Sequence, residues 1–279
     1  MELHEHKVTL YGVQDGVATI TLSRPDRMNA WTGRLHTEYR SLLERAANDP
    51  TVRVIVVTGA GRSFCVGADS KALETHVERG GYDAGVSDDL ARPGYGVRLE
   101  FDADFAYHFG IPKPIIAAIN GPAAGVGLVL ACYCDLRFAA AGVKLTTSHG
   151  RLGLPAEYGL SWLLPRLIGL TRANDLLLSS RVVVAEEAAQ MGLINQVVER
   201  DRLLEVTYAY AAMLAHEVAP SSLAVTKLQI YRDLHGDVAS SVQDAGDRMA
   251  HMMQGAEFAE GVAALTERRP PKFPDPTPN

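Results

Sequence analysis

The stretch PIIAAINGPAAGVGLVLACYCD, from Pro114 to Asp135, decides the fold. It opens on an apolar run, residues 115–119, with the length and composition of a buried strand. Residues 120–122 interrupt that run, because glycine allows positive φ and proline lacks a backbone donor. Residues 128–134 are again apolar and compatible with a helix. We therefore predict a strand, a tight turn containing the glycines of 125–127, and a buried helix.

The turn before this helix could bind an anion or a developing oxyanion. Glycine lets a ligand approach the backbone N–H groups, which lie at the positive end of a helix dipole. Plain packing of a helix against a sheet explains this stretch equally well. A membrane span is excluded, since only about a dozen apolar residues follow Pro122 and roughly 20 are needed. A phosphate loop is excluded, because no Gly-Lys-Ser/Thr follows the glycines.

Composition is that of an ordinary globular enzyme. The 279 residues are 47% hydrophobic and 22% charged, enough for one large domain or a domain with an appendage. The net charge of −6 argues against nucleic-acid binding, which needs a basic surface. The start, MELHEHKVTL, does not resemble a signal peptide. Cys65, Cys132 and Cys134 have apolar neighbours in the sequence and no metal-site spacing. We expect reduced, buried thiols in a cytoplasmic protein without a metal.

Apolar periodicity and turn residues predict the remaining elements. Alternation over 8–22, around Asp15-Gly16, indicates a hairpin. Thr32 is expected to cap a helix that runs to about Ala47. The other predicted strands are 52–58, 136–140, 143–147 and 193–198, and the other predicted helices are 101–109, 160–169, 185–192, 203–218, 221–234 and 238–254. We expect a mobile loop at 75–96, a loop at 149–159 and an extended tail at 268–279. The fold class is α/β, with β-β-α units in residues 1–200 and a helical region in 201–279.

A second glycine-bearing stretch, GAGRSFCVGADSK, follows the strand predicted at 52–58 and covers residues 59–71. Its small residues, Gly67 and Ala68, permit a close approach of backbone or ligand. A glycine loop after a strand is usually only a turn, so this stretch gains meaning from its combination with the first one.

Together the two stretches resemble a known family. FCVGADSK (Phe64–Lys71) and NGPAAGVGLVLACYCD (Asn120–Asp135) are similar to the two signatures of the enoyl-CoA hydratase/isomerase family, the crotonase superfamily. RPDRMNAW (Arg24–Trp31) resembles its early CoA-binding loop. LPRLIG (Leu164–Gly169) and AAQMGLINQV (Ala188–Val197) resemble two later family segments. The five pieces occur in the family's order, and the resemblance covers roughly residues 8 to 270.

The resemblance implies a crotonase-like spiral of ββα repeats with a C-terminal helical trimerisation region, hence a homotrimer or a dimer of trimers. It implies an acyl-CoA substrate, with no cofactor because coenzyme A is part of the substrate, and no nucleic acid or membrane as a partner. The oxyanion hole would be the backbone N–H groups of Ala68 and Val126, although the family usually has glycine at the second position. The implied contacts with coenzyme A are Arg24, Arg27, Ala68, Asp69, Ser70 and Lys71, with Lys272 from a neighbouring subunit's tail.

The chain departs from the family at the two glutamates that hydrate 2-enoyl-CoA. By position these glutamates fall on Val129 and His149, neither of which is a carboxylate. Glu157 is the remaining candidate, since other branches of the family place a working carboxylate in this loop. We expect Glu157 to be the main acid or base, with its pKa raised by burial. His149 would be its partner, because the unperturbed pKa of histidine lies near neutrality.

These residues favour an enzyme that acts on an acyl-CoA thioester through an oxyanion-stabilised enolate. Hydration by the usual pair of glutamates is disfavoured. A proton-shift isomerisation, or hydration with a single carboxylate, fits better, because moving a proton needs only one base. Two alternatives stay open. One is a non-catalytic acyl-CoA-binding protein, which is favoured by Val129 because valine cannot act as an acid or base. The other is a CoA-thioester hydrolase or dehalogenase.

Overall fold

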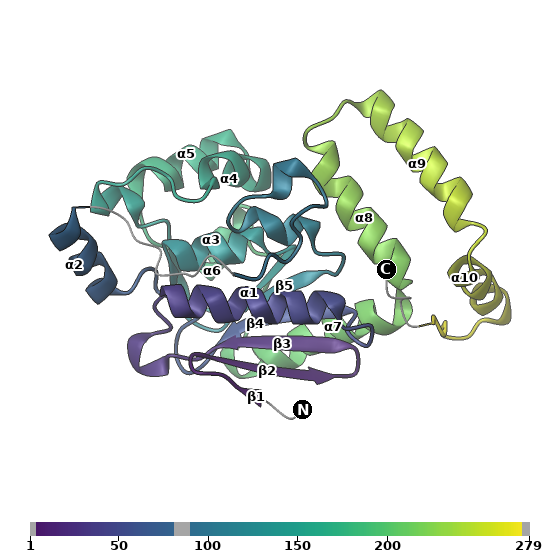
Figure 1. Cartoon of the computed structure of the whole chain (residues 1–279), viewed down its shortest axis with the longest axis horizontal. Helices are drawn as coiled ribbons and strands as arrows, with labels where there is room; N and C mark the ends of the chain where they lie inside the picture. The colour runs from purple at the N-terminus through teal and green to yellow at the C-terminus, as the bar shows by residue number, and fades with distance from the viewer. Residues whose placement is uncertain (1–3, 81–89, 275–279) are drawn as a thin grey trace.

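A seven-stranded sheet forms the centre of the computed structural model, which describes residues 4–80 and 90–274 (Figure 1). The strand order is β1-β2-β3-β4-β5-β7-β10. Pairs β1/β2 and β2/β3 are antiparallel and the other four are parallel. The strands are β1 (His4–Glu5), β2 (Thr9–Gln14), β3 (Val17–Leu22), β4 (Val54–Gly59), β5 (Ile115–Ile119), β7 (Leu136–Ala140) and β10 (Gln196–Val198). The predicted hairpin over 8–22 is confirmed as β2 and β3.

Helices cover the sheet and continue beyond it at the C-terminal end (Figure 1). Strands β3, β4 and β5 are buried along their whole length, as expected for sheet strands covered on both faces. The helices are α1 (Gly33–Asn48), α2 (Ser70–Arg79), α3 (Val126–Tyr133), α4 (Leu160–Ile168), α5 (Leu170–Ser179), α6 (Ala185–Gln190), α7 (Leu203–Glu217), α8 (Pro220–Asp233), α9 (Val238–Met252) and α10 (Ala256–Glu267). Within the described ranges, no helix is long and apolar enough to cross a membrane.

A second, three-stranded sheet consists of β6 (Ala123–Ala124), β8 (Lys144–Thr146) and β9 (Val183–Val184), in the order β6-β8-β9. Two isolated bridges join further segments: Cys65 pairs with Ala123, and Trp31 pairs with Ala68. Segments that follow β3, β4 and β5 are thereby connected side by side. This arrangement is the β-β-α spiral expected from the sequence.

Helix α1 forms as predicted, with one addition. The Thr32 hydroxyl accepts a hydrogen bond from the Leu35 N–H at 3.2 Å, so Thr32 is the N-cap. The apolar face expected from the sequence is buried, and it comprises Leu35, Tyr39, Leu42, Leu43 and Ala46. His36 and Arg40 on the same helix are buried too, and the sequence did not predict this.

Some predicted boundaries are wrong. The loop predicted at 75–96 begins with the last turns of α2, which ends at Gly80 in the left-handed conformation (φ +67°); residues 81–89 lie outside the described residues. The helix predicted at 101–109 is two 3₁₀ helices, Leu99–Phe101 and Ala106–Gly110, because Phe105 has φ +64°. Helices α5 and α10 were not predicted. Each begins directly after a glycine, Gly169 or Gly255, near which the preceding helix was predicted to end.

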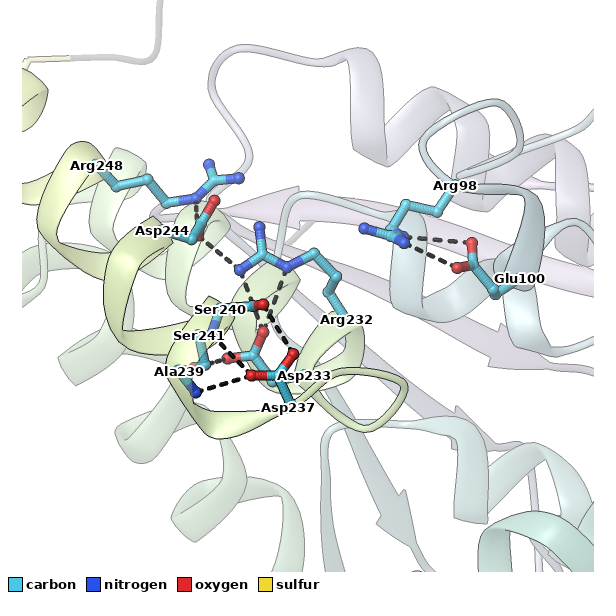
Figure 2. Close-up of polar contacts among 10 residues, drawn as sticks. All are labelled: Arg98, Glu100, Arg232, Asp233, Asp237, Ala239, Ser240, Ser241, Asp244 and Arg248. Atoms are coloured by element: carbon cyan, nitrogen blue, oxygen red, sulfur yellow. Dashed lines mark hydrogen bonds and ion pairs between the residues drawn. The ribbon is translucent and has the colours of Figure 1, made fainter.

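The junction between α8 and α9 is held by a network of polar side chains (Figure 2). The Asp237 carboxylate caps α9, accepting from the N–H groups of Ala239 and Ser240 at 3.0 Å each. Asp244 on α9 pairs with Arg232 of α8 and with Arg248, both at 2.6 Å. This network fixes the turn by which the chain leaves α8.

Helix α7 packs against the sheet, in contact with β3, β4, β5 and β7. Its buried residues are Leu203, Thr207, Ala211 and Ala215. The boundary predicted at residue 200 stays a prediction, but the first helix beyond it contributes to the core of residues 1–200.

Candidate active site

A cavity of about 800 Å³ opens where four segments of the chain meet. The segments are the start of α1 with the residues before it, the residues from Val66 into α2, the start of α3, and the loop from Ser148 to Tyr158. Each segment follows a strand of the central or the small sheet. Ala68, Val126, His149 and Glu157, which the sequence nominated for catalysis, all line this cavity.

Backbone hydrogen bonds hold the two glycine-bearing stretches together. The Cys65 N–H donates to the Pro122 carbonyl at 3.2 Å, and the Ala124 N–H donates to the Cys65 carbonyl at 3.0 Å. The Gly125 N–H donates in turn to the Thr146 carbonyl at 3.1 Å. These bonds place the turn after β4 beside the turn that starts α3.

Two glycines are required at this junction. Gly67 has φ +101°, and a Cβ atom there would lie 3.2 Å from the Ala124 carbonyl oxygen. A Cβ atom on Gly127 would lie 2.1 Å from the Cys65 carbonyl oxygen, a distance that no side chain tolerates. The small residues expected to allow close backbone approach therefore do so.

The backbone around Ala68 leaves its N–H group available. Trp31 forms the two neighbouring bonds, donating to the Gly67 carbonyl at 2.7 Å and accepting from the Asp69 N–H at 3.0 Å. Val126 is the first residue of α3, where a helical N–H has no partner within the helix. In residues 4–80 and 90–274 neither the Ala68 nor the Val126 N–H donates a backbone hydrogen bond. Both residues line the cavity, so two unpaired donors are available to one ligand.

Glu157 is the sole carboxylate among the described residues that line the cavity. Its Oε2 lies 3.7 Å from the point where Gly125 would carry a Cβ atom, next to Val126. Burial raises the pKa of Glu157 above the ordinary 4.5, while His149 acts in the opposite direction. The predicted pKa shift is confirmed in direction. A carboxyl group in this position can exchange a proton with a ligand.

His149 is 5% exposed and is close enough to Glu157 to influence its charge. Within the described part of the chain, its ring has no hydrogen-bond partner, so both nitrogens are available to a ligand or to Glu157. Val129, by contrast, is 1% exposed in the core on α3 and does not line the cavity. The position where the family has its first glutamate is thus an ordinary packing position here.

The proposed CoA-binding residues fall into two groups. Arg24 and Asp69 form an ion pair at 2.9 Å, and Arg24 also donates to the Ala30 carbonyl at 2.5 Å. Burial opposes ionisation of Asp69, but hydrogen bonds from Arg24 and from the Lys71 N–H outweigh it and lower the pKa of Asp69. The ion pair between Arg24 and Asp69 therefore joins the loop after β3 to the residue before α2. Ser70 and Lys71, on the first turn of α2, are exposed, as is Arg27.

Lys272 lies near α10 of its own chain, where its N–H donates to Glu260 at 2.6 Å. Its contact with coenzyme A in a neighbouring subunit stays a prediction. The three cysteines are free and buried, as expected. Burial raises the pKa of Cys65 to about 12 and that of Cys132 to about 11, so neither is a nucleophile. No group of three or more metal-binding side chains occurs among the described residues.

Sequence reasoning missed four further side chains of the cavity wall. Trp31, His36, His76 and Tyr158 all line the cavity. His36 follows the apolar face of α1 by one position, a signal too weak to distinguish a buried histidine from a solvated one. Tyr158 adjoins Glu157, but nothing in the loop composition indicates that it faces inward.

Comparison with known proteins identifies the family of this chain. The family model described as enoyl-CoA hydratase/isomerase matches residues 12–276. A probable enoyl-CoA hydratase of Mycobacterium tuberculosis is 38% identical over 271 residues, covering 94% of this chain and 90% of the relative. The 1,2-epoxyphenylacetyl-CoA isomerase of Escherichia coli is 33% identical over 261 residues, covering 94% and 96%.

Solved structures agree as well. The crystal structure of a probable enoyl-CoA hydratase/isomerase from Mycobacterium abscessus superimposes with a TM-score of 0.84 at 30% identity, covering 99% of each chain. The fold predicted from the resemblance is thereby confirmed. The chain belongs to the enoyl-CoA hydratase/isomerase family, the crotonase superfamily, and is an enzyme that acts on CoA thioesters.

Proposed function

We propose that this enzyme moves a proton on the acyl group of a CoA thioester, and so isomerises it, with Glu157 as the acid and base. The observation that carries the proposal is the position of Glu157. It is the lone carboxylate on the described cavity wall, and it lies beside Gly125, at the start of the helix whose first N–H is free.

In this reaction the thioester oxygen accepts hydrogen bonds from the N–H groups of Ala68 and Val126. The Glu157 carboxylate removes a proton from a carbon of the acyl chain, and the electron pair moves onto the thioester oxygen as an enolate. The protonated Glu157 then returns the proton to another carbon, so the double bond shifts and the atoms balance. Each oxyanion donor contributes roughly 10²–10³ in rate. The reaction requires no cofactor, because coenzyme A belongs to the substrate.

Isomerisation is favoured over hydration because the described residues place one carboxylate on the cavity wall. Val129 is buried in the core and His149 takes the place of the second family glutamate. The E. coli relative is named as an isomerase of a phenylacetyl-CoA derivative, which supports isomerase chemistry on this scaffold. Hydration with Glu157 and His149 holding the water is the second candidate, since the His149 ring is near Glu157 and forms no hydrogen bond with the described residues.

For binding of coenzyme A we propose direct contacts from Arg27, Ser70, Lys71 and the backbone of Ala68. Arg24 and Asp69 act indirectly, because their charges already neutralise each other in an ion pair. The proposal is supported by exposure: Arg27, Ser70 and Lys71 are free to reach phosphates and the pantetheine chain at the cavity mouth.

We further propose that the C-terminal helices join copies of the chain into a homotrimer or a dimer of trimers. Helices α9 and α10 carry exposed apolar side chains, among them Val242 (67% exposed) and Leu265 (81%). A largely apolar hollow of about 650 Å³ lies between α8, α9 and α10. Exposed apolar surface of this extent is typical of an interface.

The test is a panel of 2-enoyl-, 3-enoyl- and dienoyl-CoA thioesters, including aryl-substituted ones, incubated in deuterated water and followed by mass spectrometry. Isomerisation predicts deuterium exchange or double-bond movement without a gain in mass from added water. Gain of water would establish the hydratase instead. Release of free thiol or halide would indicate hydrolysis or dehalogenation. If the enzyme binds these thioesters tightly but causes none of these changes, the proposal that it catalyses a reaction of this substrate class is overturned.

A further inference from the structure

One wall of the cavity is aromatic and continuous. Phe105 is fully buried and contacts three rings that face the cavity: Trp31, His36 and Tyr158. The ring centroids lie 5.6 Å from Trp31, 5.9 Å from His36 and 5.0 Å from Tyr158. The rings of His36 and Phe105 are parallel to within 4°. Such spacings are those of favourable aromatic pairs, so these rings hold one another in place.

The wall connects the two halves of the catalytic site. The backbone of Trp31 is hydrogen-bonded to Gly67 and Asp69, the two neighbours of the first oxyanion donor, Ala68. Tyr158 directly follows Glu157 in the sequence. Because Ala68, Val126 and these rings line one cavity, an acyl group whose thioester oxygen is bound between the two N–H groups can extend along this wall. Flat aromatic groups stack well on such a surface.

His36 contributes an imidazole ring to this wall. Its side chain lies 3.8 Å from Asp104, measured from Nε2 to Oδ1, and is 8% exposed. Nε2 is buried and has no hydrogen-bond partner. Asp104 is held in turn by Arg40, at 3.3 Å from Nη1. The carboxylate of Asp104 therefore faces one ring nitrogen of His36, while the ring lines the cavity.

The imidazole is neutral at physiological pH. Burial lowers the pKa of His36, Arg40 lowers it further, and Asp104 acts in the opposite direction. A neutral imidazole has one donor and one acceptor nitrogen. The nearby Asp104 carboxylate favours the proton on Nε2, which leaves Nδ1 as the acceptor. The ring nitrogens of His36 have no hydrogen bond within the described residues, so Nδ1 is available to a ligand.

We propose that His36 accepts a hydrogen bond from a hydroxyl group on the acyl moiety, so that the enzyme selects hydroxyaryl acyl-CoA thioesters over their unsubstituted aryl counterparts. The inference rests on the proposed function only in using the same cavity and the same position of the thioester. His36 is thus the specificity-determining residue, and the substrate has an aromatic acyl group with a hydroxyl substituent.

Calorimetric binding of unreactive, saturated analogues tests the proposal without any turnover. The probes are 3-phenylpropanoyl-CoA and its 2-, 3- and 4-hydroxyphenyl isomers. We expect one hydroxy isomer to bind the wild-type enzyme about tenfold more tightly than the phenyl compound, the typical contribution of one buried hydrogen bond. Equal affinity for all four compounds would overturn the proposal, whatever the enzyme is found to catalyse.

Substitutions identify the residue responsible. His36→Phe keeps the aromatic wall and removes both nitrogens, so the affinity ratio is expected to fall to about one. His36→Gln keeps an acceptor, serves as a second variant if the first is unstable, and should retain part of the preference. His76→Phe, at another histidine of the cavity wall, should change both affinities by the same factor. Preference that persists in His36→Phe contradicts the assignment. If the enzyme isomerises a substrate but does not prefer hydroxyaryl analogues, only the role assigned to His36 is wrong. If it prefers hydroxyaryl analogues but turns over no substrate, only the proposed function is wrong.

Discussion

The carboxylate of Glu157 lies beside Gly125, with Oε2 3.7 Å from the position that a Cβ atom on Gly125 would occupy. Gly125 directly precedes Val126, whose free N–H begins α3. An acid-base group and an oxyanion donor therefore occupy neighbouring positions, although Glu157 comes 31 positions after Val126 in the sequence. Formation of a thioester enolate needs a base at a carbon of the acyl chain and a hydrogen-bond donor at the thioester oxygen.

Replacing Glu157 with Gln should abolish most turnover while leaving binding of acyl-CoA nearly intact. The amide keeps the size and polarity of the side chain but cannot accept a proton. Removal of one general acid-base group costs about 10²–10⁴ in rate. Steady-state kinetics on the substrate found in the panel, with calorimetry of a saturated analogue, measures both quantities. A variant with wild-type kcat would remove Glu157 from the mechanism.

The kcat/KM of the enzyme should fall at acidic pH, because the base must be ionised. The midpoint of this acid limb should lie above pH 4.5, because burial raises the pKa of Glu157. His149 lowers that pKa. His149→Ala should therefore move the limb of the kcat/KM profile to higher pH. His235→Ala, at a histidine stacked on Trp162 away from the cavity, should leave the limb in place.

The raised pKa of Glu157 should also affect the stability of the protein. A carboxyl group whose pKa is raised in the folded protein favours folding while it is protonated, and this contribution is lost as the pH rises through the folded pKa. Glu157→Gln cannot ionise. We expect its free energy of unfolding to exceed that of the wild type above the folded pKa, with the difference vanishing below pH 4.5, the ordinary value. Denaturant titrations at several pH values measure this difference, and a variant less stable at high pH contradicts it.

The sequence predicts the core of this fold better than the cavity wall. The strands β4 and β5 and the helix α3 are buried on all sides, so their apolar runs needed no partner to be recognised. The aromatic wall is different, because Trp31, His36, Phe105 and Tyr158 come from three separate segments. Phe105 reaches the wall only because a positive φ divides a predicted helix into two short 3₁₀ turns. Local pattern does not contain that information.

Arg24 and Arg27 were predicted to do the same task, but their surroundings differ. Arg24 is bound to Asp69 and to the Ala30 carbonyl, whereas Arg27 is exposed. Arg24→Gln should destabilise the protein by about 1.5–3 kcal/mol, the range for a hydrogen bond to a charged group. Arg27→Gln should leave the free energy of unfolding unchanged and weaken binding of acyl-CoA.

Salt separates the two effects. If Arg27 contacts a phosphate, the affinity of the wild type should fall as ionic strength rises, and that of Arg27→Gln should fall less steeply. Calorimetry at two salt concentrations and urea denaturation of both variants provide the comparison. Loss of stability in Arg27→Gln, or none in Arg24→Gln, would reverse the roles assigned to these residues.

Self-association should depend on the apolar faces of α9 and α10. Val242→Asp or Leu265→Asp would place a charge on the proposed interface, and burial of an unpaired charge is costly. We expect sedimentation velocity to show a smaller species than the wild type. Leu178→Asp is the control, since Leu178 is 84% exposed on α5, outside this surface. Dissociation by Leu178→Asp, or an unchanged assembly in the other two, would place the interface elsewhere.

Gly125→Ala should impair catalysis more than its effect on stability explains. Gly125 has φ +50° and ψ −126°, a conformation that residues with a side chain rarely adopt. The alanine would relieve the strain, about 1–3 kcal/mol, by rotating the peptide that leads to the Val126 N–H. Its Cβ atom would also touch the Glu157 carboxylate at van der Waals distance, 3.7 Å from Oε2, while the rotated peptide would displace the donor.

Gly142→Ala is the matched control. Gly142 also has a positive φ, +70°, but no atom lies within 4 Å of its added Cβ. Both variants should therefore lose thermal stability through backbone strain, whereas only Gly125→Ala should lose kcat, by at least the roughly hundredfold that a misplaced oxyanion donor costs. Equal kcat in the two variants at a temperature where both are folded would show that the Gly125 turn does not set the position of the donor. The relation between Gly125 and Glu157 would then be one of packing, with no part in the chemistry.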